Sequence, residues 1–290
     1  MTAVAVHPRR GAGRIYVHAE PSPEVARWIR TQDAEGKARR TVLERRTTLA
    51  RMERDLGCPA VAADAEQVTE WIGRNRSQRS AITVASDLSK VRAFYRWALA
   101  AGLRADDPTI LIKAPRRPRR QPRPISDSQY WRLVDAATSL ELRAMLLLAG
   151  LAGLRVHEVA KIHGHDIDHD ARTLTVTGKG GHRHTVPVHP EIIAAAAKMP
   201  FAGYWFPSQR SRHLGGREVS QRIRLHMIAC RVPGTPHALR HYFCTELVER
   251  GADLRVVQEL ARHSQLSTTA QYVGVADTRK RAAIDTLTRR

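Results

Sequence analysis

The stretch KAPRRPRRQPRP, residues 113–124, constrains the fold of this chain more than any other feature. It holds six basic residues, four prolines and no acidic residue. Because proline opposes helix formation, this composition is typical of an extended, stiffened linker. The chain has 290 residues, of which 42% are hydrophobic, so apolar material suffices for a core on each side of the linker. We therefore predict two domains of unequal size, residues 21–112 and 125–290.

The first domain is predicted to be helical. Residues 1–20 lack an apolar period and are expected to form a flexible basic tail. After them, apolar residues recur at spacings of three and four, as on one side of a helix. Glycine and polar stretches interrupt this pattern, which predicts helices at 23–34, 38–56, 65–75 and 79–101. On the last of these, Lys90, Arg92 and Arg96 form a charged face that either meets solvent or contacts phosphate groups.

The second domain is predicted to combine helices with one β-hairpin. Ser126 is a candidate N-cap for the helix in ISDSQYWRLVDAA, and ELRAMLLLAGLAG is apolar enough to be a buried helix, with Gly150 and Gly153 helping the chain to turn. LRVHEVAKI returns to helical spacing, whereas LTVTGKGGHRHTVPV alternates β-branched residues around a glycine-rich turn. The rest, from Pro190 onward, is mainly helical. The predicted fold class is mainly α, with a small antiparallel β-sheet in the second domain.

Charge indicates the kind of partner. The 48 lysines and arginines exceed the 28 acidic residues, which gives a formal net charge of +20. Such an excess favours a polyanionic partner. No apolar run is long enough to cross a membrane and the first residues lack a signal-peptide core, so a cytosolic protein is expected. The three cysteines have neither disulfide-framework nor zinc-finger spacing.

Five motifs point to one family. GLRVHE, TGKGGHRHTVPV, HALRHYF, ELARHS and TTAQYVGV follow one another along the second half of the chain. In this order they resemble the tyrosine recombinases, the family of phage integrases and Xer-type enzymes. The resemblance spans about residues 22–280, by helical pattern in the first half and by motif in the second. It implies that a tyrosine attacks a DNA phosphodiester and forms a 3′-phosphotyrosyl link, with no cofactor and no metal.

By this resemblance, Arg155 and Arg240 are the two essential arginines, and guanidinium groups can donate paired hydrogen bonds to phosphate oxygens. Tyr272 is the nucleophile; its ordinary pKa of about 10 means that neighbours must activate it. His237 lies one helical turn before Arg240, on the same helix face, with Thr235 as a possible cap. The resemblance leaves open whether His237 accepts the proton of the tyrosine or binds a phosphate oxygen.

The resemblance assigns roles to three further residues. His263 is expected to donate a hydrogen bond to a nonbridging phosphate oxygen. Lys179, in the hairpin turn, is expected to protonate the leaving 5′-oxygen. Glu158 is expected to support Arg155 without acting as a base.

The sequence departs from the family pattern at two places. Arg262 stands where the family commonly has glycine, and it could alter how the helix ends, contact a phosphate or face solvent. His182 and His184 occupy hairpin positions that are frequently lysine or arginine, so DNA contacts there could weaken as the pH rises through the histidine range.

The resemblance also implies an assembly. A helical core-binding domain and an α+β catalytic domain would clamp double-stranded DNA that carries a specific core site, and four protomers would exchange strands between two sites through a Holliday junction. A C-terminal helix at about 277–290 would dock on a neighbouring protomer. DNA contacts are expected from Lys90, Arg92, Arg96, Lys113, Arg116, Arg117, Arg119, Arg120 and Arg123.

Alternatives from other classes remain at this point. A DNA-binding accessory protein of the same fold would not cut DNA, and a type IB topoisomerase would use similar chemistry to relax it. TGKGG lacks the spacing of a nucleotide-binding P-loop. The histidines of HEVAKIHGHDIDHD match no helical zinc motif, so a metal site is not expected. The bacterial cytoplasm is the expected compartment.

Overall fold

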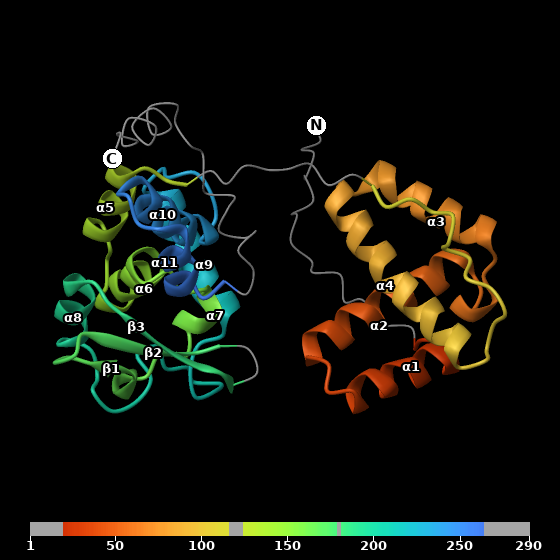
Figure 1. Ribbon diagram of the computed structural model, residues 1–290, viewed down its shortest axis with the longest axis horizontal. Coiled ribbons are helices and arrows are strands. Elements are labelled where there is room, and N and C mark those ends of the chain that lie inside the picture. Colours follow the sequence, from red (N-terminus) through yellow and green to blue (C-terminus); the bar gives the residue numbers. More distant parts are fainter. Residues whose placement is uncertain (1–19, 116–123, 179–180, 264–290) are drawn as a thin grey trace, which may run out of the picture. The chain divides into compact units, whose positions relative to one another are not determined.

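The computed structural model describes residues 20–115, 124–178 and 181–263. The chain divides into two compact units, Met1–Arg119 and Arg120–Arg290 (Figure 1). The expected basic tail, the central part of the linker, Lys179, Tyr272 and the expected C-terminal helix lie outside the described residues. Among the residues that the structure describes, no helix is long and apolar enough to cross a membrane.

The first unit is helical, as predicted. Its elements are α1 (Pro23–Ala34), α2 (Arg39–Leu56), the short 3₁₀ helix η1 (Ala60–Ala62), α3 (Ala65–Gln78) and α4 (Ala81–Ala100). Side-chain caps explain several of the starts: Ser22 and Ser80 accept hydrogen bonds from the first turns of α1 and α4, and Asp64 forms a capping box with Gln67 at α3. The predicted end of the third helix at residue 75 was wrong, since α3 continues to Gln78.

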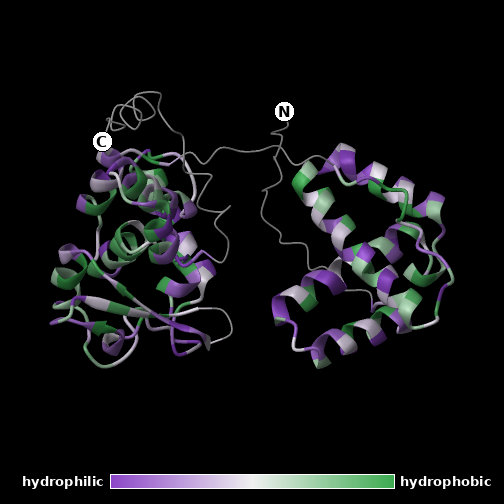
Figure 2. Cartoon of the chain, in the orientation of Figure 1, coloured by the Kyte–Doolittle hydropathy of each residue, from purple (hydrophilic) through white to green (hydrophobic). Residues whose placement is uncertain are grey.

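Large aromatic side chains fill the core of this unit. Trp28, Trp71, Phe94 and Tyr95 are fully buried, and the Trp28 and Phe94 rings meet edge to face at a centroid distance of 5.5 Å. The Tyr95 hydroxyl donates to the carbonyl of Ala60, which satisfies a polar group inside an apolar cluster. Figure 2 shows hydrophobic and hydrophilic residues interspersed along these helices, as expected where part of each helix is buried.

The second unit surrounds one buried helix with six other α-helices and a small sheet, within the residues that the structure describes. Its helices are α5 (Asp127–Asp135), α6 (Leu140–Leu151), α7 (Val156–Val159), the 3₁₀ helix η2 (Gly164–Asp166), α8 (Pro190–Ala196), α9 (Gly216–Ala229), α10 (His237–Glu249) and α11 (Leu254–Ala261). Its strands are β1 (Ile167–Asp168), β2 (Thr173–Thr177) and β3 (Arg183–Pro187).

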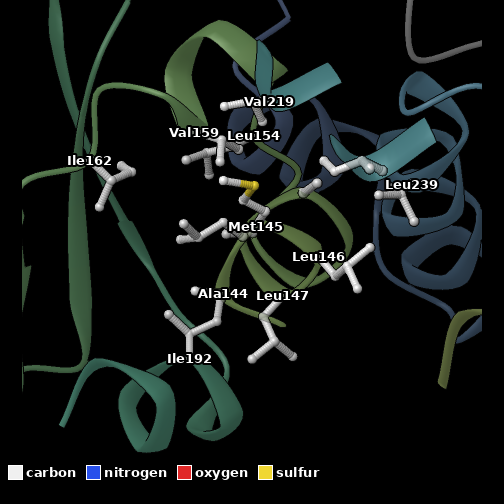
Figure 3. Packing of buried hydrophobic residues seen from close by; sticks show 14 of the residues in the cluster. Ala144, Met145, Leu146, Leu147, Leu154, Val159, Ile162, Ile192, Val219 and Leu239 are labelled. Atoms are coloured by element: carbon white, nitrogen blue, oxygen red, sulfur yellow. The ribbon is translucent and has the colours of Figure 1, made fainter. Parts of the chain in front are cut away.

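Helix α6 is the centre of this unit. Every residue from Ala144 to Gly150 is buried, as the apolar sequence predicted, because α5, α7, α8, α9 and α10 all contact α6. Figure 3 shows side chains of α6 between Ile192 of α8, Val219 of α9 and Leu239 of α10, with the strands on the far side of α6 from α10. This packing fixes the ends of α6 and α10, where the arginines described below lie.

The sheet is antiparallel, with strand order β1-β2-β3. The predicted hairpin is confirmed, since Thr173 pairs with Pro187 and Thr177 with Arg183. The pattern missed β1, which contributes only two residues and is too short to show alternation. The helix expected in LRVHEVAKI is also shorter than predicted: only Val156–Val159 is helical.

Gly153 and Gly150 have different structural roles. Gly153 has φ +61 and lies in the turn after α6, where a β-carbon would lie 2.4 Å from a ring carbon of Phe243. Gly150 lies inside α6, so its predicted role in turning the chain was wrong. Its β-carbon would lie 2.1 Å from a ring carbon of Tyr130, and glycine therefore allows α5 and α6 to approach closely. Ser126 caps α5 as predicted, in a capping box with Gln129.

Candidate functional site

Four of the six predicted catalytic residues lie in described segments, and the structure brings them together in the second unit. Arg155 precedes α7, His237 and Arg240 lie on the first turn of α10, and His263 follows α11. The charges of Arg155 and Arg240 reach both histidines and affect their pKa values. Residues far apart in the sequence therefore share one electrostatic environment. The other two candidates, Lys179 and Tyr272, are outside the described residues.

Arg240 is held almost entirely by main-chain groups. Its side chain is among the largest that are fully buried, and its residue is 1% exposed. One terminal nitrogen donates to the carbonyl of Gly153, and the other donates to the carbonyl of Ala261. Burial, together with the charges of Arg155 and Arg262, lowers the pKa of Arg240 to about 10, so the guanidinium is still charged at neutral pH. A carbonyl orients this charge without neutralising it.

The helix that carries Arg240 begins without the predicted cap. The N-cap of α10 is Pro236 and no side chain caps it, so the predicted role of Thr235 was wrong. Thr235 contributes instead through its main chain, because its carbonyl accepts from the N–H of Ala238. His237 and Arg240 are three residues apart on this helix and therefore project from the same face.

Glu158 holds Arg155 at two points. Its carboxylate accepts from the backbone N–H of Arg155 and from Nη1 of the same residue, each at 2.9 Å. The Glu158 side chain is 3% exposed, whereas that of Arg155 is 35% exposed. Burial alone would raise the pKa of Glu158, but the backbone hydrogen bond and the charges of Arg262 and Arg155 lower it overall. The carboxylate therefore stays ionised and leaves part of the Arg155 guanidinium open to solvent.

Arg262 completes this network and does not face solvent. Its Nη2 lies 3.2 Å from Glu158 Oε2 and donates to the carbonyl of Gly153 at 3.3 Å. The side chain is only 5% exposed, so the solvent-facing alternative was wrong. The helix α11 ends one residue earlier, and Arg262 is its C-cap in the left-handed conformation with φ 54. The sequence pattern identified this position because arginine stands where the family commonly has glycine. It could not identify the partner, because Glu158 lies on a distant segment of the chain.

The histidines of the site favour the neutral form. Burial is the main cause, followed by the charge of Arg240; together they lower the pKa of His263 to about 4. Partial desolvation, with the charges of Arg240 and Arg155, also lowers the pKa of His237. His241 was not predicted from the motif, yet its ring lies 4.5 Å from that of His237 and its pKa falls to about 4, first through burial and then through His237. Neutral imidazoles can each donate and accept one hydrogen bond.

The site has an excess of positive charge. Among the groups described above, Arg155, Arg240 and Arg262 are cationic, and Glu158 is the carboxylate that pairs with Arg155 and Arg262. With neutral histidines, two positive charges stay uncompensated within a partly buried region. Such an arrangement favours an anionic ligand, and planar guanidinium groups suit phosphate oxygens.

A cleft of about 620 Å³ adjoins the site between β3 and α11. His184 is exposed on the hairpin and lines this cleft, as His263 does on the opposite side. His182 is exposed too, near the hairpin turn. The lining residues are Arg183, His184, Thr185, Val186, Arg255, Gln258, Glu259, Arg262 and His263.

The predicted DNA-contacting residues differ in exposure. Arg96 and Lys113 are exposed, which leaves them accessible to a ligand. Lys90 instead lies 3.5 Å from the buried carboxylate of Asp87, and Arg92 donates to the carbonyl of Ile112. Their roles in DNA binding stay predictions. Five more candidates lie outside the described residues: Arg116, Arg117, Arg119, Arg120 and Arg123.

The histidine-rich segment after α7 serves local structure. His163 Nε2 accepts from the N–H of Gly203 at 3.0 Å, and its ring packs against Tyr204. Within the described parts of the chain, no group of three or more His, Cys, Asp or Glu residues could hold a metal ion.

Known proteins similar to this chain are integrases and Xer recombinases. Residues 124–279 match the model of the phage integrase family. The tyrosine recombinase XerD of Vibrio vulnificus is 36% identical over 211 residues, which cover 66% of this chain and 69% of that protein. The tyrosine recombinase XerC of Alcanivorax borkumensis is 34% identical over 216 residues, with coverages of 68% and 70%.

Solved structures agree with this likeness. The integrase of mycobacterium phage Brujita is 39% identical and covers 92% of each chain, with a TM-score of 0.50. A lambda integrase dimer bound to a COC′ core site has a TM-score of 0.72 at 17% identity and covers 86% of this chain and 75% of its own. The second comparison indicates a shared fold.

Proposed function

Since this chain belongs to the phage integrase family of tyrosine recombinases, it is a tyrosine-type, site-specific DNA recombinase, and we propose that Tyr272 is its nucleophile. The observation that carries this proposal is the cluster of Arg155, Arg240, His237 and His263, with its uncompensated positive charge. A scissile phosphate bound there would meet guanidinium groups and neutral imidazoles at once.

The proposed reaction is an exchange of phosphodiester bonds. The phenol oxygen of Tyr272 attacks phosphorus, a bond to the enzyme forms at the 3′-phosphate, and the bond to the 5′-oxygen breaks. Lys179 gives a proton to that 5′-oxygen. The phenol proton passes either to His237 or to a phosphate oxygen that His237 binds. Because the phosphotyrosyl link conserves the bond energy, a 5′-hydroxyl from a partner strand can reverse the step and complete strand exchange.

The described side chains support different parts of this scheme. Arg155 and Arg240 would stabilise the charge that develops on the nonbridging oxygens, as preorganised donors do in other phosphoryl transfers. The low pKa of His263 keeps its ring neutral, so it would act as a hydrogen-bond donor and not as a second cation. Glu158 would keep Arg155 oriented through its two hydrogen bonds.

Binding would extend beyond the reactive phosphate. We assign double-stranded DNA as the partner, gripped by both domains, with the arginines of residues 113–124 and the exposed Arg96 on its backbone. The net charge of +20 supports this assignment. Four protomers on two core sites, with a Holliday junction between the two strand exchanges, would complete the reaction in the bacterial cytoplasm. Substituting the linker arginines should lower the salt dependence of binding, whereas an unchanged slope would make the linker a mere tether.

A covalent-trapping experiment tests the nucleophile. Wild-type protein is mixed with nicked duplexes of randomised core sequence, and DNA that stays attached in detergent is sequenced to define a core site. On that site, Tyr272→Phe should still bind but form no adduct. An adduct with this variant would remove Tyr272 from its proposed role.

A second experiment tests the general acid. Lys179→Ala should cleave the selected duplex slowly, because the 5′-oxygen then leaves without a proton. A 5′-bridging sulfur leaves readily as a thiolate and should restore most of the rate. If the sulfur substrate gives no rescue, Lys179 is not the acid.

A further inference from the structure

Arg262 adopts a backbone conformation that opposes its residue type. It has φ 54 and ψ 47 at the end of α11, where glycine is the usual residue. A side chain with a β-carbon is strained in this region. Arg172 and Arg231 also have positive φ values, but both are exposed. Arg262 differs from them because its side chain is buried.

The buried guanidinium reaches the two groups that hold the catalytic arginines. Its contact with Glu158 is made to Oε2, while Arg155 Nη1 bonds Oε1 of the same carboxylate. Its contact with Gly153 is made to the carbonyl that also accepts from Arg240. Arg262 thus shares one partner with each catalytic arginine.

The same contacts fix the end of α11. The carbonyl of Ala261 accepts from Arg240, and Nη1 of Arg262 bonds the carbonyl of Leu260 at 2.8 Å. His263 follows directly, with its N–H bonded to the carbonyl of Gln258. The segment that carries His263 is therefore tied to the segment that carries Arg155.

We propose that Arg262 is a positioning residue for DNA cleavage: it clamps Glu158 and the Gly153 carbonyl, and through them orients Arg155 and Arg240 on the phosphate. This inference rests on the proposed function. A direct phosphate contact fits less well, because the terminal nitrogens are already used inside the protein and the side chain is 5% exposed.

The test compares Arg262→Gly with Arg231→Gly, since both replace an arginine of positive φ by glycine. Each variant is measured on the duplex selected by covalent trapping, at saturating protein in a single turnover. We expect Arg262→Gly to keep wild-type DNA affinity and salt slope while forming the covalent complex at least about 10-fold more slowly, which is about 1.4 kcal/mol in the barrier. Arg231→Gly should cleave like wild type.

Two further variants separate positioning from folding. Arg262→Lys retains a charge near Glu158 but lacks the planar fork that reaches the carbonyls of Gly153 and Leu260 as well, so it should recover part of the rate. Combining Arg262→Gly with Glu158→Gln should slow cleavage by less than the product of the two separate defects, because both changes disturb Arg155 through the same carboxylate. If the rate reductions of the two single variants multiply in the double variant, the two residues act separately and the proposal is overturned.

Three other results would also overturn it. Cleavage by Arg262→Gly at the wild-type rate would remove the role. A loss of affinity with a salt slope smaller by about one would indicate a direct phosphate contact instead. A fall in melting temperature that accounts for the lost activity would make Arg262 purely structural. By contrast, wild-type protein that formed no adduct would refute the proposed function itself, and this inference with it.

Discussion

Replacing Glu158 by glutamine should expose how much the site depends on one buried carboxylate. Glutamine keeps the shape of the side chain but removes the charge. Arg262 is 5% exposed, so its guanidinium would stay buried without a counter-charge, and breaking a buried pair in this way costs about 3–5 kcal/mol. Arg155 is 35% exposed and can return to water, so its lost ion pair adds about 1 kcal/mol at most.

The expected loss for Glu158→Gln is therefore on the order of 4 kcal/mol in the second unit, or about 10 °C in its melting temperature. Calorimetry and urea unfolding of the full chain measure it. The matched control is Glu259→Gln, which breaks an exposed pair with Arg255 and should cost less than about 0.5 kcal/mol.

A double-mutant cycle then isolates the pair with Arg262. Arg262→Gly alone should cost less than Glu158→Gln, because glycine relieves the left-handed backbone and Glu158 keeps its bonds to Arg155. In the Glu158→Gln background the same change removes the uncompensated charge, so the double variant should be more stable than Glu158→Gln alone by about 2 kcal/mol. The network would be refuted if the free-energy changes of the two single variants simply added in the double variant. It would also be refuted if Glu158→Gln lowered the free energy of unfolding as little as Glu259→Gln does.

Three shorter predictions concern other parts of the molecule. Burial and nearby arginine charges lower the pKa of His263 from 6.5 to about 4, so the fold prefers the neutral ring; stability should be full above pH 6.5 and fall as the pH drops toward 4. His263→Gln should flatten that loss in urea titrations, and an unchanged pH slope would contradict the assignment. Gly150→Ala places a β-carbon 2.1 Å from the Tyr130 ring and should cost about 1–3 kcal/mol, a cost that should largely vanish when the same change is made in a Tyr130→Ala background; equal melting temperatures of Gly150→Ala and wild type would disprove the close approach. Asp87→Asn leaves Arg51, 2.7 Å away and 17% exposed, without its carboxylate; calorimetry should show the first unit about 3 kcal/mol less stable, and a neutral effect would rule out this pairing.

Local rules accounted for most of the helices. Ser22, Ser80 and Ser126 each cap the helix that the apolar spacing predicted, because a serine hydroxyl satisfies an N–H of the first turn whatever the rest of the fold. The failures have a common cause. Gly150 carries no local signal that distinguishes a turn from a close helix contact, since that distinction depends on Tyr130 arriving from another helix.

The same distinction between local signals and contacts with distant segments applies to the site. The order of the motifs located Arg155, Arg240, His237 and His263, which the structure places in one electrostatic environment. It could not identify the partner of Arg262, because the Glu158 carboxylate lies on a segment more than a hundred positions earlier in the chain. Nor did it find the low pKa of His241, which arises from burial and from the ring of His237.

The hydrogen bonds that hold Arg240 affect which amino-acid substitutions this site can tolerate. Both of its acceptors are backbone carbonyls, at Gly153 and Ala261, and a carbonyl is present whatever side chain a position carries. Point mutations can therefore not delete these acceptors; they can only move them, by shifting the end of α6 or of α11. Substitutions around Arg240 should therefore matter only where they move one of those two helix ends, as at Gly153, where a β-carbon would meet Phe243, or at Arg262, which bonds the Gly153 carbonyl.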